Sequence, residues 1–272
     1  RVRSSAASDV YKRQIQIDYQ EIISGDEGIK KWLEQLHYKG ISIVKNAPTE
    51  KESGFDVLSN ISHHRETFFK TPFEVIDIPN PNNSAYTAAA LRNHIDLPYY
   101  EIAPGYQFLH CLINDATGGE SVALDGFKVA SYMKENFTEY FKILLDTPVK
   151  FVNRDYTANT IRVMHKPIFT LDHNNDFNDI RFSVAYMGIM DCSPEVMDSF
   201  YEAYRKLLSL LHDPMFEINF RLEAGDIFSF NNRRVLHGRK EYDANSGNRH
   251  LQGYYIDRDE IVGRLNYLNK IN

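Results

Sequence analysis

The stretch DIFSFNNRRVLHGRKEYDANSGNRHLQGYYI (226–256) decides the fold. It holds three short apolar and aromatic runs, DIFSF, RVLHGR and HLQGYYI, separated by segments rich in Asn, Asp, Gly and Ser. Runs of this length and composition predict β-strands joined by turns. Two earlier runs, ISIVKN (41–46) and QFLHCLI (107–113), have the same character. The chain is therefore expected to be mainly β.

Helical periodicity occurs in four places around these strands. From Asp26, apolar residues at i, i+3, i+4 and i+7 form one face, and Gly40 is expected to end that helix. Similar spacing predicts helical structure at 129–145, 194–212 and 257–268, the second of these with Pro194 in its first turn. Many short strands with a few covering helices indicate an α+β protein, mainly β, built on one β-sandwich or jelly-roll domain.

Composition narrows the class of protein. The 272 residues are 43% hydrophobic and 25% charged, which excludes wholesale disorder. The net charge of −6 argues against a nucleic-acid-binding protein. Two cysteines exclude a disulfide-built secreted scaffold and favour a reducing, cytoplasmic setting. No apolar run approaches the roughly 20 residues that span a bilayer, so no membrane association is expected.

The first 14 residues, RVRSSAASDVYKRQ, differ from the rest of the chain. They have no apolar periodicity, and they carry Arg and Ser without Glu, a composition that a transit peptide shares. We interpret them as a leader or an artefact. Residues 15–272 are expected to form a single domain.

The triplet His94-Ile95-Asp96 is the one H-x-D in the chain. In a strand, residues i and i+2 point to the same face, so an imidazole and a carboxylate could converge on one point. The triplet alone is weak evidence, because a lone histidine is more often a packed or solvated residue.

A second histidine and an arginine strengthen the case. His237 lies far along the chain, and Arg249 follows it by twelve residues. Two histidines and one carboxylate form the facial triad that binds Fe(II) and leaves the opposite coordination face open. An α-oxo acid such as 2-oxoglutarate chelates a metal through that face, and a permanently charged guanidinium suits its distant carboxylate. If the RVLHGR and HLQGYY runs are neighbouring strands of one barrel, His237 and Arg249 both face inward.

Two blocks of sequence carry a family resemblance. NHIDLPYYEIAPGYQFLHCLINDATGGESVALDGF (93–127) and LEAGDIFSFNNRRVLHGRKEYDANSGNRHLQGYYIDRDE (222–260) resemble the γ-butyrobetaine dioxygenase family, within the taurine-dioxygenase-like Fe(II)/2-oxoglutarate oxygenases. The resemblance implies a double-stranded β-helix (jelly-roll) core and a catalytic domain over residues 15–272.

The resemblance also implies roles for individual residues. His94, Asp96 and His237 would be the catalytic iron ligands, and Arg249 would hold the 2-oxoglutarate carboxylate. Ser121 and Leu109 would line the same cosubstrate pocket. From residue type alone, Arg233, Arg234 and Arg239 of the second block could reach a substrate carboxylate, but they are expected at the solvated surface.

The substrates of this family carry a trimethylammonium group, which has no N–H to donate and is held by aromatic rings through cation–π attraction. Residues at matching offsets, expected to bind the substrate, are Phe69, Phe73, Asn83, Tyr86 and Tyr255. For Phe69 and Phe73, an ordinary core role is an equal alternative when they are considered alone.

Two positions depart from the family pattern. Ile95 stands where the family usually has Thr, and its side chain should point away from the metal. Leu97 stands where some members have a cage tyrosine, and Tyr99 or Tyr100 are the aromatic residues that would compensate.

The resemblance implies hydroxylation of γ-butyrobetaine to L-carnitine, with Fe(II), 2-oxoglutarate and O₂, and with ascorbate as the expected reductant. The first alternative is the same chemistry on trimethyllysine or another quaternary amine, which the loss of an aromatic residue at Leu97 motivates. The second alternative is a non-catalytic jelly-roll binding protein. A homodimer is also expected.

Overall fold

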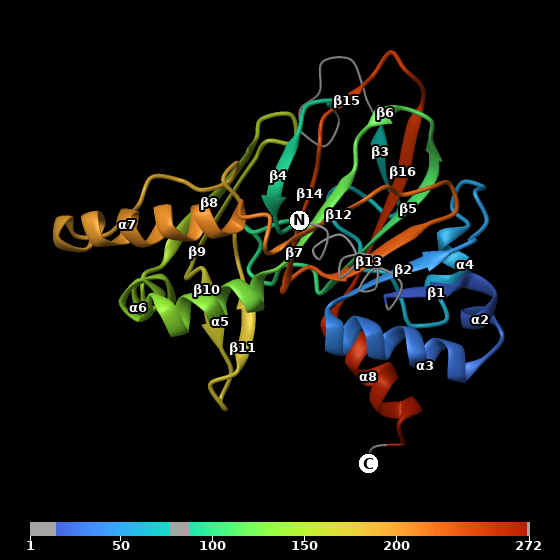
Figure 1. Ribbon diagram of the computed structural model, residues 1–272, viewed down its shortest axis with the longest axis horizontal. Helices are drawn as coiled ribbons and strands as arrows, with labels where there is room; N and C mark the ends of the chain where they lie inside the picture. Colours follow the sequence, from blue (N-terminus) through green and yellow to red (C-terminus); the bar gives the residue numbers. More distant parts are fainter. Residues whose placement is uncertain (1–14, 77–86, 271–272) are drawn as a thin grey trace.

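Two β-sheets pack face to face in the part of the chain that the computed structural model describes, residues 15–76 and 87–270 (Figure 1). The first sheet has the strand order β1-β2-β13-β5-β16-β3, in which only β1 and β2 run parallel. Its strands are β1 (Gln16–Asp18), β2 (Ile41–Lys45), β13 (Ile227–Asn231), β5 (Tyr106–Asn114), β16 (Arg249–Ile256) and β3 (Phe73–Ile76). The second sheet has the antiparallel order β12-β7-β14-β4. Its strands are β12 (Glu217–Phe220), β7 (Ser121–Asp125), β14 (Val235–Arg239) and β4 (Leu91–His94).

Alternation along the strands divides their side chains between two hydrophobic layers. On β13, Phe228 and Phe230 pack between the sheets against Val235, whereas Ile227 faces the helices on the outside. The strands predicted from DIFSF, RVLHGR and HLQGYYI are therefore confirmed as β13, β14 and β16, and both faces of the six-stranded sheet are covered.

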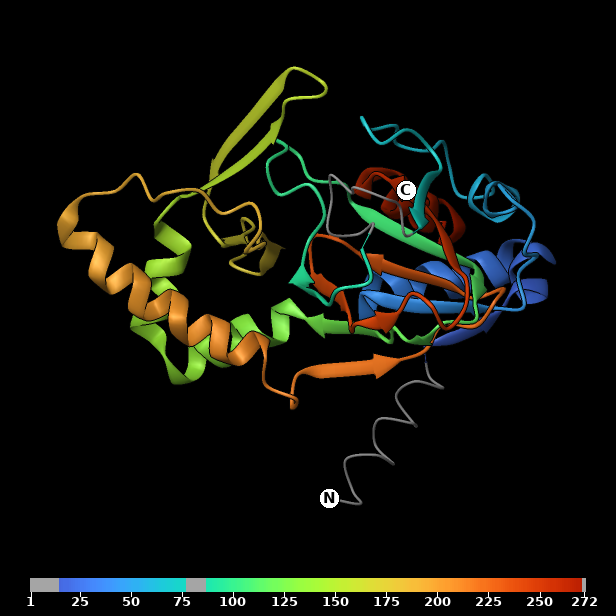
Figure 2. The same cartoon turned by 90° about the horizontal axis from the view of Figure 1, so that it is seen from above.

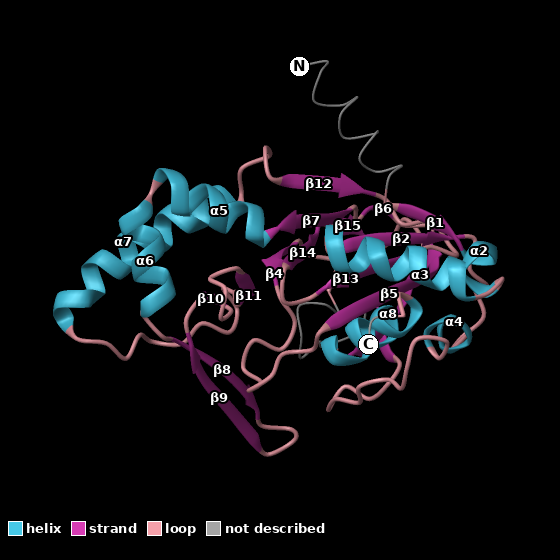
Figure 3. Ribbon diagram, turned by 90° about the horizontal axis from the view of Figure 1, so that it is seen from below, coloured by secondary structure: helices cyan, strands magenta, loops and turns pink. Residues whose placement is uncertain are grey.

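Four helices cover the outer face of this sheet (Figure 3). They are α2 (Tyr19–Ile23), α3 (Asp26–Glu34), α4 (Gly54–Leu58) and α8 (Arg258–Leu268). The helix predicted from Asp26 is confirmed, and Trp32 on its apolar face meets Phe108 of β5 edge-on at 5.7 Å. Its last turn widens to a π-helix, η1 (Gln35–Lys39), and Gly40 ends it with φ 76°, a conformation that glycine adopts without strain.

A second group of elements lies beside the four-stranded sheet (Figure 2). It contains three helices and two hairpins: α5 (Gly126–Asn136), α6 (Thr138–Asp146), α7 (Pro194–Leu211), β8 (Val149–Asp155) with β9 (Thr160–Lys166), and β10 (Phe169–Leu171) with β11 (Phe177–Ile180). The helical segment predicted at 129–145 is two helices, because Phe137 takes an extended φ of −141° between them. A short pair, β6 (Thr117–Gly118) and β15 (Tyr242–Asp243), completes the described structure.

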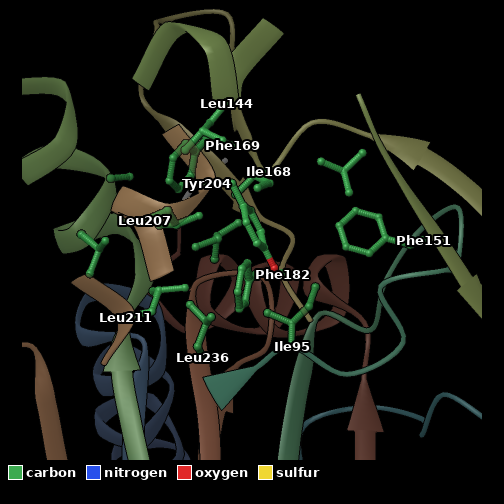
Figure 4. Packing of buried hydrophobic residues seen from close by; sticks show 14 of the residues in the cluster. Ile95, Leu144, Phe151, Ile168, Phe169, Phe182, Tyr204, Leu207, Leu211 and Leu236 are labelled. Carbon is green, nitrogen blue, oxygen red and sulfur yellow. The ribbon is translucent and has the colours of Figure 1, made fainter. Parts of the chain in front are cut away.

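The helical group connects to the sheets through a hydrophobic cluster (Figure 4). Ile95 enters this cluster beside Phe182 and Leu236, and its backbone N–H donates to the carbonyl of Phe182 at 2.9 Å. Because Ile95 is anchored on this side, the neighbouring Asp96 side chain is turned toward the space between the sheets. None of the described helices is long and apolar enough to cross a membrane.

Candidate metal centre and active site

Three of the predicted ligand residues meet at one point between the sheets. One donor atom from each of His94, Asp96 and His237 lies within 4.8 Å of the other two. His94 Nε2 is 3.2 Å and His237 Nε2 is 3.7 Å from the same oxygen, Asp96 Oδ1. We call these three residues the metal triad. His94 ends β4 and pairs with His237 of β14, whereas Asp96 lies just beyond the strand. The expectation that one strand carries the whole H-x-D is therefore wrong in this detail.

Hydrogen bonds fix the orientation of the His94 ring. Its Nδ1 lies 2.8 Å from the carbonyl oxygen of Arg92, and because a carbonyl can only accept, Nδ1 must carry a proton. In the neutral ring, Nε2 then presents its lone pair to the Asp96 carboxylate. Such a contact is repulsive unless a proton or a cation lies between the two atoms.

Three hydrogen bonds hold Asp96 in place. Asn232, which is fully buried, accepts the backbone N–H of Asp96 at 2.8 Å and donates to its carbonyl at 3.1 Å. The hydroxyl of Tyr255 donates to Asp96 Oδ2 at 2.6 Å. The carboxylate therefore has one oxygen occupied by Tyr255 and the other directed at the two histidines.

The electrostatics of the triad match those of a ligand set. Burial, together with the charge of His94, lowers the pKa of His237 to about 3, so this ring is neutral at pH 7. Burial opposes the charge on Asp96, but the hydrogen bonds from His94 and Tyr255 and the positive charge of His94 hold its pKa well below the usual range. Burial also opposes charge on His94, yet Asp96 outweighs it and raises the pKa of His94. These charges suit a divalent metal. His237 offers a neutral imidazole and Asp96 a carboxylate, and a metal cation would replace the proton of His94.

A small cavity of about 80 Å³ adjoins the triad between the two sheets. His94, Asp96 and His237 line it together with Leu109, Ser121 and Arg249. The condition considered from the sequence, that β14 and β16 are neighbouring strands, is not met, because β14 belongs to the four-stranded sheet and β16 to the six-stranded one. His237 and Arg249 nevertheless line the same cavity, because the two sheets face each other.

Arg249 is a cation without an anion among the residues that the structure describes. Its Nε is buried with no hydrogen-bond partner, and its guanidinium stacks on Tyr242, 5.6 Å from the ring centre. Burial, reinforced by nearby Arg239, lowers the pKa of Arg249 to about 10, which leaves it charged at neutral pH. A half-buried guanidinium with a buried, unsatisfied Nε is suited to bind an anion, and a carboxylate entering the small cavity would provide one.

A large cavity of about 470 Å³ also borders the triad, and His94 and Asp96 line both cavities. Three of the predicted cage residues, Phe69, Phe73 and Tyr255, line the large cavity. The ring of Phe73 stacks on Tyr255 at 5.0 Å and lies 6.1 Å from Phe69. The other two, Asn83 and Tyr86, lie outside the described residues.

Phe73 owes its position to a glycine on the neighbouring strand. Gly253 of β16 pairs directly with Phe73 of β3. A Cβ atom at Gly253 would lie 2.0 Å from Cζ of Phe73, well inside van der Waals contact. The ring can therefore reach the cavity only because residue 253 has no side chain.

The two departures from the family pattern have different consequences. Ile95 is buried in the hydrophobic cluster and points away from the triad, as expected. Leu97 lines the large cavity, as does Tyr99, whose ring meets Tyr186 edge-on at 4.7 Å. Tyr99 is thus placed to supply an aromatic surface near Leu97.

Sequence analysis missed several residues of this region. Arg239, expected at the solvated surface, is 5% exposed and lines the small cavity, because the carbonyls of Thr87 and Ala89 accept from its guanidinium. Arg233 and Arg234 instead form ion pairs with acidic residues elsewhere. The role of Asn232, which directly follows β13, was also missed.

A profile of the family described as taurine catabolism dioxygenase TauD, TfdA family, matches residues 3–255. The chain belongs to the TauD/TfdA dioxygenase family. This membership confirms the resemblance inferred from the two sequence blocks.

The curated relatives include γ-butyrobetaine dioxygenases and trimethyllysine dioxygenases. The γ-butyrobetaine dioxygenase of Pseudomonas sp. (strain AK-1) is 36% identical over 253 residues, and the Homo sapiens enzyme is 33% identical over 258 residues; each match covers 93% of this chain and 66% of the relative. The mitochondrial trimethyllysine dioxygenase of Mus musculus is 29% identical over 256 residues, covering 93% of this chain and 60% of that enzyme. The chain thus spans about two thirds or less of the length of these relatives.

Solved structures share the fold. An asparagine oxygenase in complex with Fe(II), 2S,3S-3-hydroxyasparagine and succinate superposes with a TM-score of 0.65 at 15% identity, over 85% of this chain and 82% of that one. AAD-2 in complex with Mn(II) and N-oxalylglycine gives 0.66 at 12% identity, over 85% and 89%.

Proposed function

We propose that this chain is an Fe(II)- and 2-oxoglutarate-dependent dioxygenase that hydroxylates γ-butyrobetaine to L-carnitine. The observation that carries the proposal is the position of the metal triad, which borders both a small cavity that contains the half-buried Arg249, whose Nε has no hydrogen-bond partner, and a large cavity with aromatic walls. The similarity to butyrobetaine dioxygenases supports the choice of substrate.

In this proposal each group of residues has a separate task. His94, Asp96 and His237 hold Fe(II) on one face, and Arg249 binds the distant carboxylate of 2-oxoglutarate with Ser121 and Leu109 beside it. Fe(II) and 2-oxoglutarate, when bound, supply the oxidative chemistry, in which O₂ converts the oxo acid to succinate and CO₂ and one oxygen atom enters a substrate C–H bond.

The walls of the large cavity position the substrate. The rings of Phe69, Phe73 and Tyr255 form an aromatic wall for a trimethylammonium group, and each ring face that the group meets contributes about 0.5–2 kcal/mol of cation–π attraction depending on desolvation. Because Tyr255 also donates to Asp96, the ring wall and the metal triad are held at a fixed separation.

The proposal includes the architecture and state of the protein. Residues 15–272 form one catalytic domain whose two facing sheets are a double-stranded β-helix, and the enzyme works as a cytoplasmic homodimer. The two-sheet arrangement and the shared fold of the oxygenase structures support the first part. Sedimentation equilibrium tests the second part, and a monomer would contradict it.

Succinate release tests the activity. The protein is incubated with Fe(II), ascorbate, 2-oxoglutarate and one amine from a panel of γ-butyrobetaine, trimethyllysine and other betaines. We expect the highest turnover with γ-butyrobetaine. A higher rate with trimethyllysine would favour the alternative substrate, to which Leu97 points because it adds no ring to the cavity. No amine-dependent succinate with any of these compounds would contradict the proposal.

A non-catalytic binding protein is distinguished without an assay of turnover. In a dioxygenase, Mn(II) in place of Fe(II) should bind to the wild-type protein and fail to bind to His94→Ala. A protein that binds no divalent metal would support the binding-protein alternative.

A further inference from the structure

A buried arginine holds the turn that follows the metal ligand Asp96. Arg181 comes directly after β11 and is 8% exposed. Its guanidinium donates to the backbone carbonyls of three residues of this turn, Pro98, Tyr100 and Glu101, the last two at 2.6 and 3.3 Å. Because the planar fork of an arginine carries several donors in fixed directions, one side chain fixes three carbonyls of the turn at once.

The charge of Arg181 serves this turn and not an acidic side chain. Burial lowers the pKa of Arg181 to about 10, so the guanidinium remains charged at neutral pH. Asp179, whose charge opposes this shift, forms its ion pair with Arg233. No ion pair within residues 15–76 and 87–270 includes Arg181. The carbonyl dipoles stabilise the buried cation, and its removal would leave those carbonyls unsatisfied.

The backbone of the turn needs support from outside. Leu97 has φ 54°, a left-handed conformation that residues with a side chain rarely adopt. Within the turn, the N–H of Tyr100 donates to the carbonyl of Leu97 at 3.0 Å. Such conformations persist where the surrounding structure holds them, and the guanidinium of Arg181 supplies three of the contacts that do so.

The same turn forms part of the wall of the large cavity. Leu97 and Tyr99 are both buried, and both line this cavity. The ring of Tyr99 meets that of Tyr186, another lining residue, edge-on at 4.7 Å. Burial raises the pKa of Tyr99, and Tyr186 and the charge of Asp96 add to the shift, so its hydroxyl lies within electrostatic reach of the metal triad. The position of the turn therefore decides the shape of the cavity beside the triad.

The metal ligand in front of the turn has its own support. Asn232 binds both the backbone N–H and the carbonyl of Asp96, and Tyr255 donates to the carboxylate. These bonds do not involve Arg181. Loss of the Arg181 guanidinium should therefore displace the cavity wall and leave the metal triad in place.

We infer that Arg181 is a positioning residue for the amine substrate: by holding residues 97–101 it sets the part of the cavity wall that Leu97 and Tyr99 form. This inference rests on the proposed function and deepens it, because it names a residue outside the metal triad and the cosubstrate pocket that determines how the amine lies at the metal. A displaced wall should weaken binding of the amine without changing binding of the metal or the oxo acid.

Binding of γ-butyrobetaine measures the effect directly. Anaerobic calorimetry is carried out on protein loaded with Mn(II) and 2-oxoglutarate, for wild type, Arg181→Lys, Arg181→Met and the control Arg221→Met. Arg221 is a matched control, because its guanidinium also donates to three backbone carbonyls, those of Asn114, Ala116 and Gly118. Arg221 is not among the described residues that line either cavity.

Arg181→Met should bind γ-butyrobetaine about 10-fold more weakly, the loss that one hydrogen bond from a charged donor typically causes. Arg181→Lys keeps the charge but can make fewer of the bonds, so its affinity should be intermediate. Arg221→Met should bind the amine like wild type. The affinity for Mn(II) and the KM for 2-oxoglutarate should be the same in wild type and in both Arg181 variants.

A double-mutant cycle with Tyr99→Leu tests whether Arg181 acts through the cavity wall. Arg181→Lys and Tyr99→Leu should each weaken amine binding, and the double variant should be weakened by less than the product of the two effects. Effects that multiply would overturn the inference, as would an equal loss in Arg181→Met and Arg221→Met. If Arg181→Met does not fold, the cycle with Arg181→Lys decides alone.

The outcomes separate the inference from the proposed function. If wild type converts γ-butyrobetaine and the Arg181 variants bind it with unchanged affinity, the role of Arg181 is wrong and the function stands. If wild type neither binds nor converts any betaine, the proposed function fails and the inference fails with it.

Discussion

The hydroxyl of Tyr255 joins the aromatic wall to the metal triad through a single hydrogen bond to Asp96. Tyr255→Phe keeps the ring and removes this donor, which leaves Asp96 Oδ2 free to turn. Because residues that orient metal ligands typically contribute 10- to 100-fold to affinity, we expect Mn(II) to bind about 10-fold more weakly. Titration followed by electron paramagnetic resonance measures this, with Tyr267→Phe at an exposed tyrosine as control. Equal affinity in the two variants would contradict the role of the hydroxyl.

His110 should make stability depend on pH. It is fully buried in β5, and burial lowers its pKa to about 4 from 6.5. As pH falls below about 6.5 the unfolded chain binds a proton that the folded protein does not accept, so stability is lost between about pH 6.5 and 4. The loss attributable to His110 is about 3 kcal/mol at most. Urea unfolding at pH 7 and pH 5 should show a smaller difference for His110→Gln than for wild type, and identical differences would refute this.

The hairpin of β8 and β9 projects from the rest of the fold (Figure 2), and Arg162 of β9 connects it to an aromatic residue that neighbours the large cavity. Arg162 lies 4.4 Å from the ring centre of Phe68, and Phe68 packs on Phe69 at 4.1 Å. Arg162→Ala removes a cation–π contact worth about 0.5–1 kcal/mol, so the KM for the amine should rise roughly 2- to 5-fold while the KM for 2-oxoglutarate stays unchanged. Arg154→Ala, on the adjacent strand, is the matched control. An equal effect of both variants would show that the hairpin acts only through general stability.

At the level of elements, the sequence predicted what depends on local periodicity. The helix from Asp26 and the strands β13, β14 and β16 occur where expected, because one face or every second residue must be apolar. The break at Phe137 and the π-helical turn before Gly40 were not visible, since both preserve an amphipathic pattern while altering the backbone.

The candidate site shows a similar division. Residue type and spacing, together with the family resemblance, identified His94, Asp96, His237 and Arg249. The structure places these four residues around one small cavity. That His237 and Arg249 come from opposite sheets could not be seen, because strand order depends on pairing between distant segments. The bonds of Asn232 and Tyr255 to Asp96 span 136 and 159 residues and leave no periodic trace.

For the whole molecule, ligand binding should be a source of stability. The residues of the metal triad come from β4, from β14 and from the loop after β4. A bound metal therefore connects segments that are far apart in the chain. At 100 times the dissociation constant, a ligand stabilises the folded state by about 2.7 kcal/mol. For a chain of this size, Mn(II) with N-oxalylglycine should raise Tm by roughly 5–10 °C. A chelator should reverse the increase, and His237→Ala should not show it; an increase that survives His237→Ala would place the metal elsewhere.

Gly253 pairs with Phe73, and the range of substrates that the cavity accepts therefore depends on residue 253 having no Cβ atom. A methyl group added at Gly253 of β16 would displace the ring of Phe73 on β3. The ammonium end of the cavity would change shape, while the residues proposed to touch iron or the oxo acid would stay the same. Among relatives of this chain, a glycine-to-alanine exchange at this position would therefore be a short evolutionary route to a new amine specificity with the oxidative machinery intact.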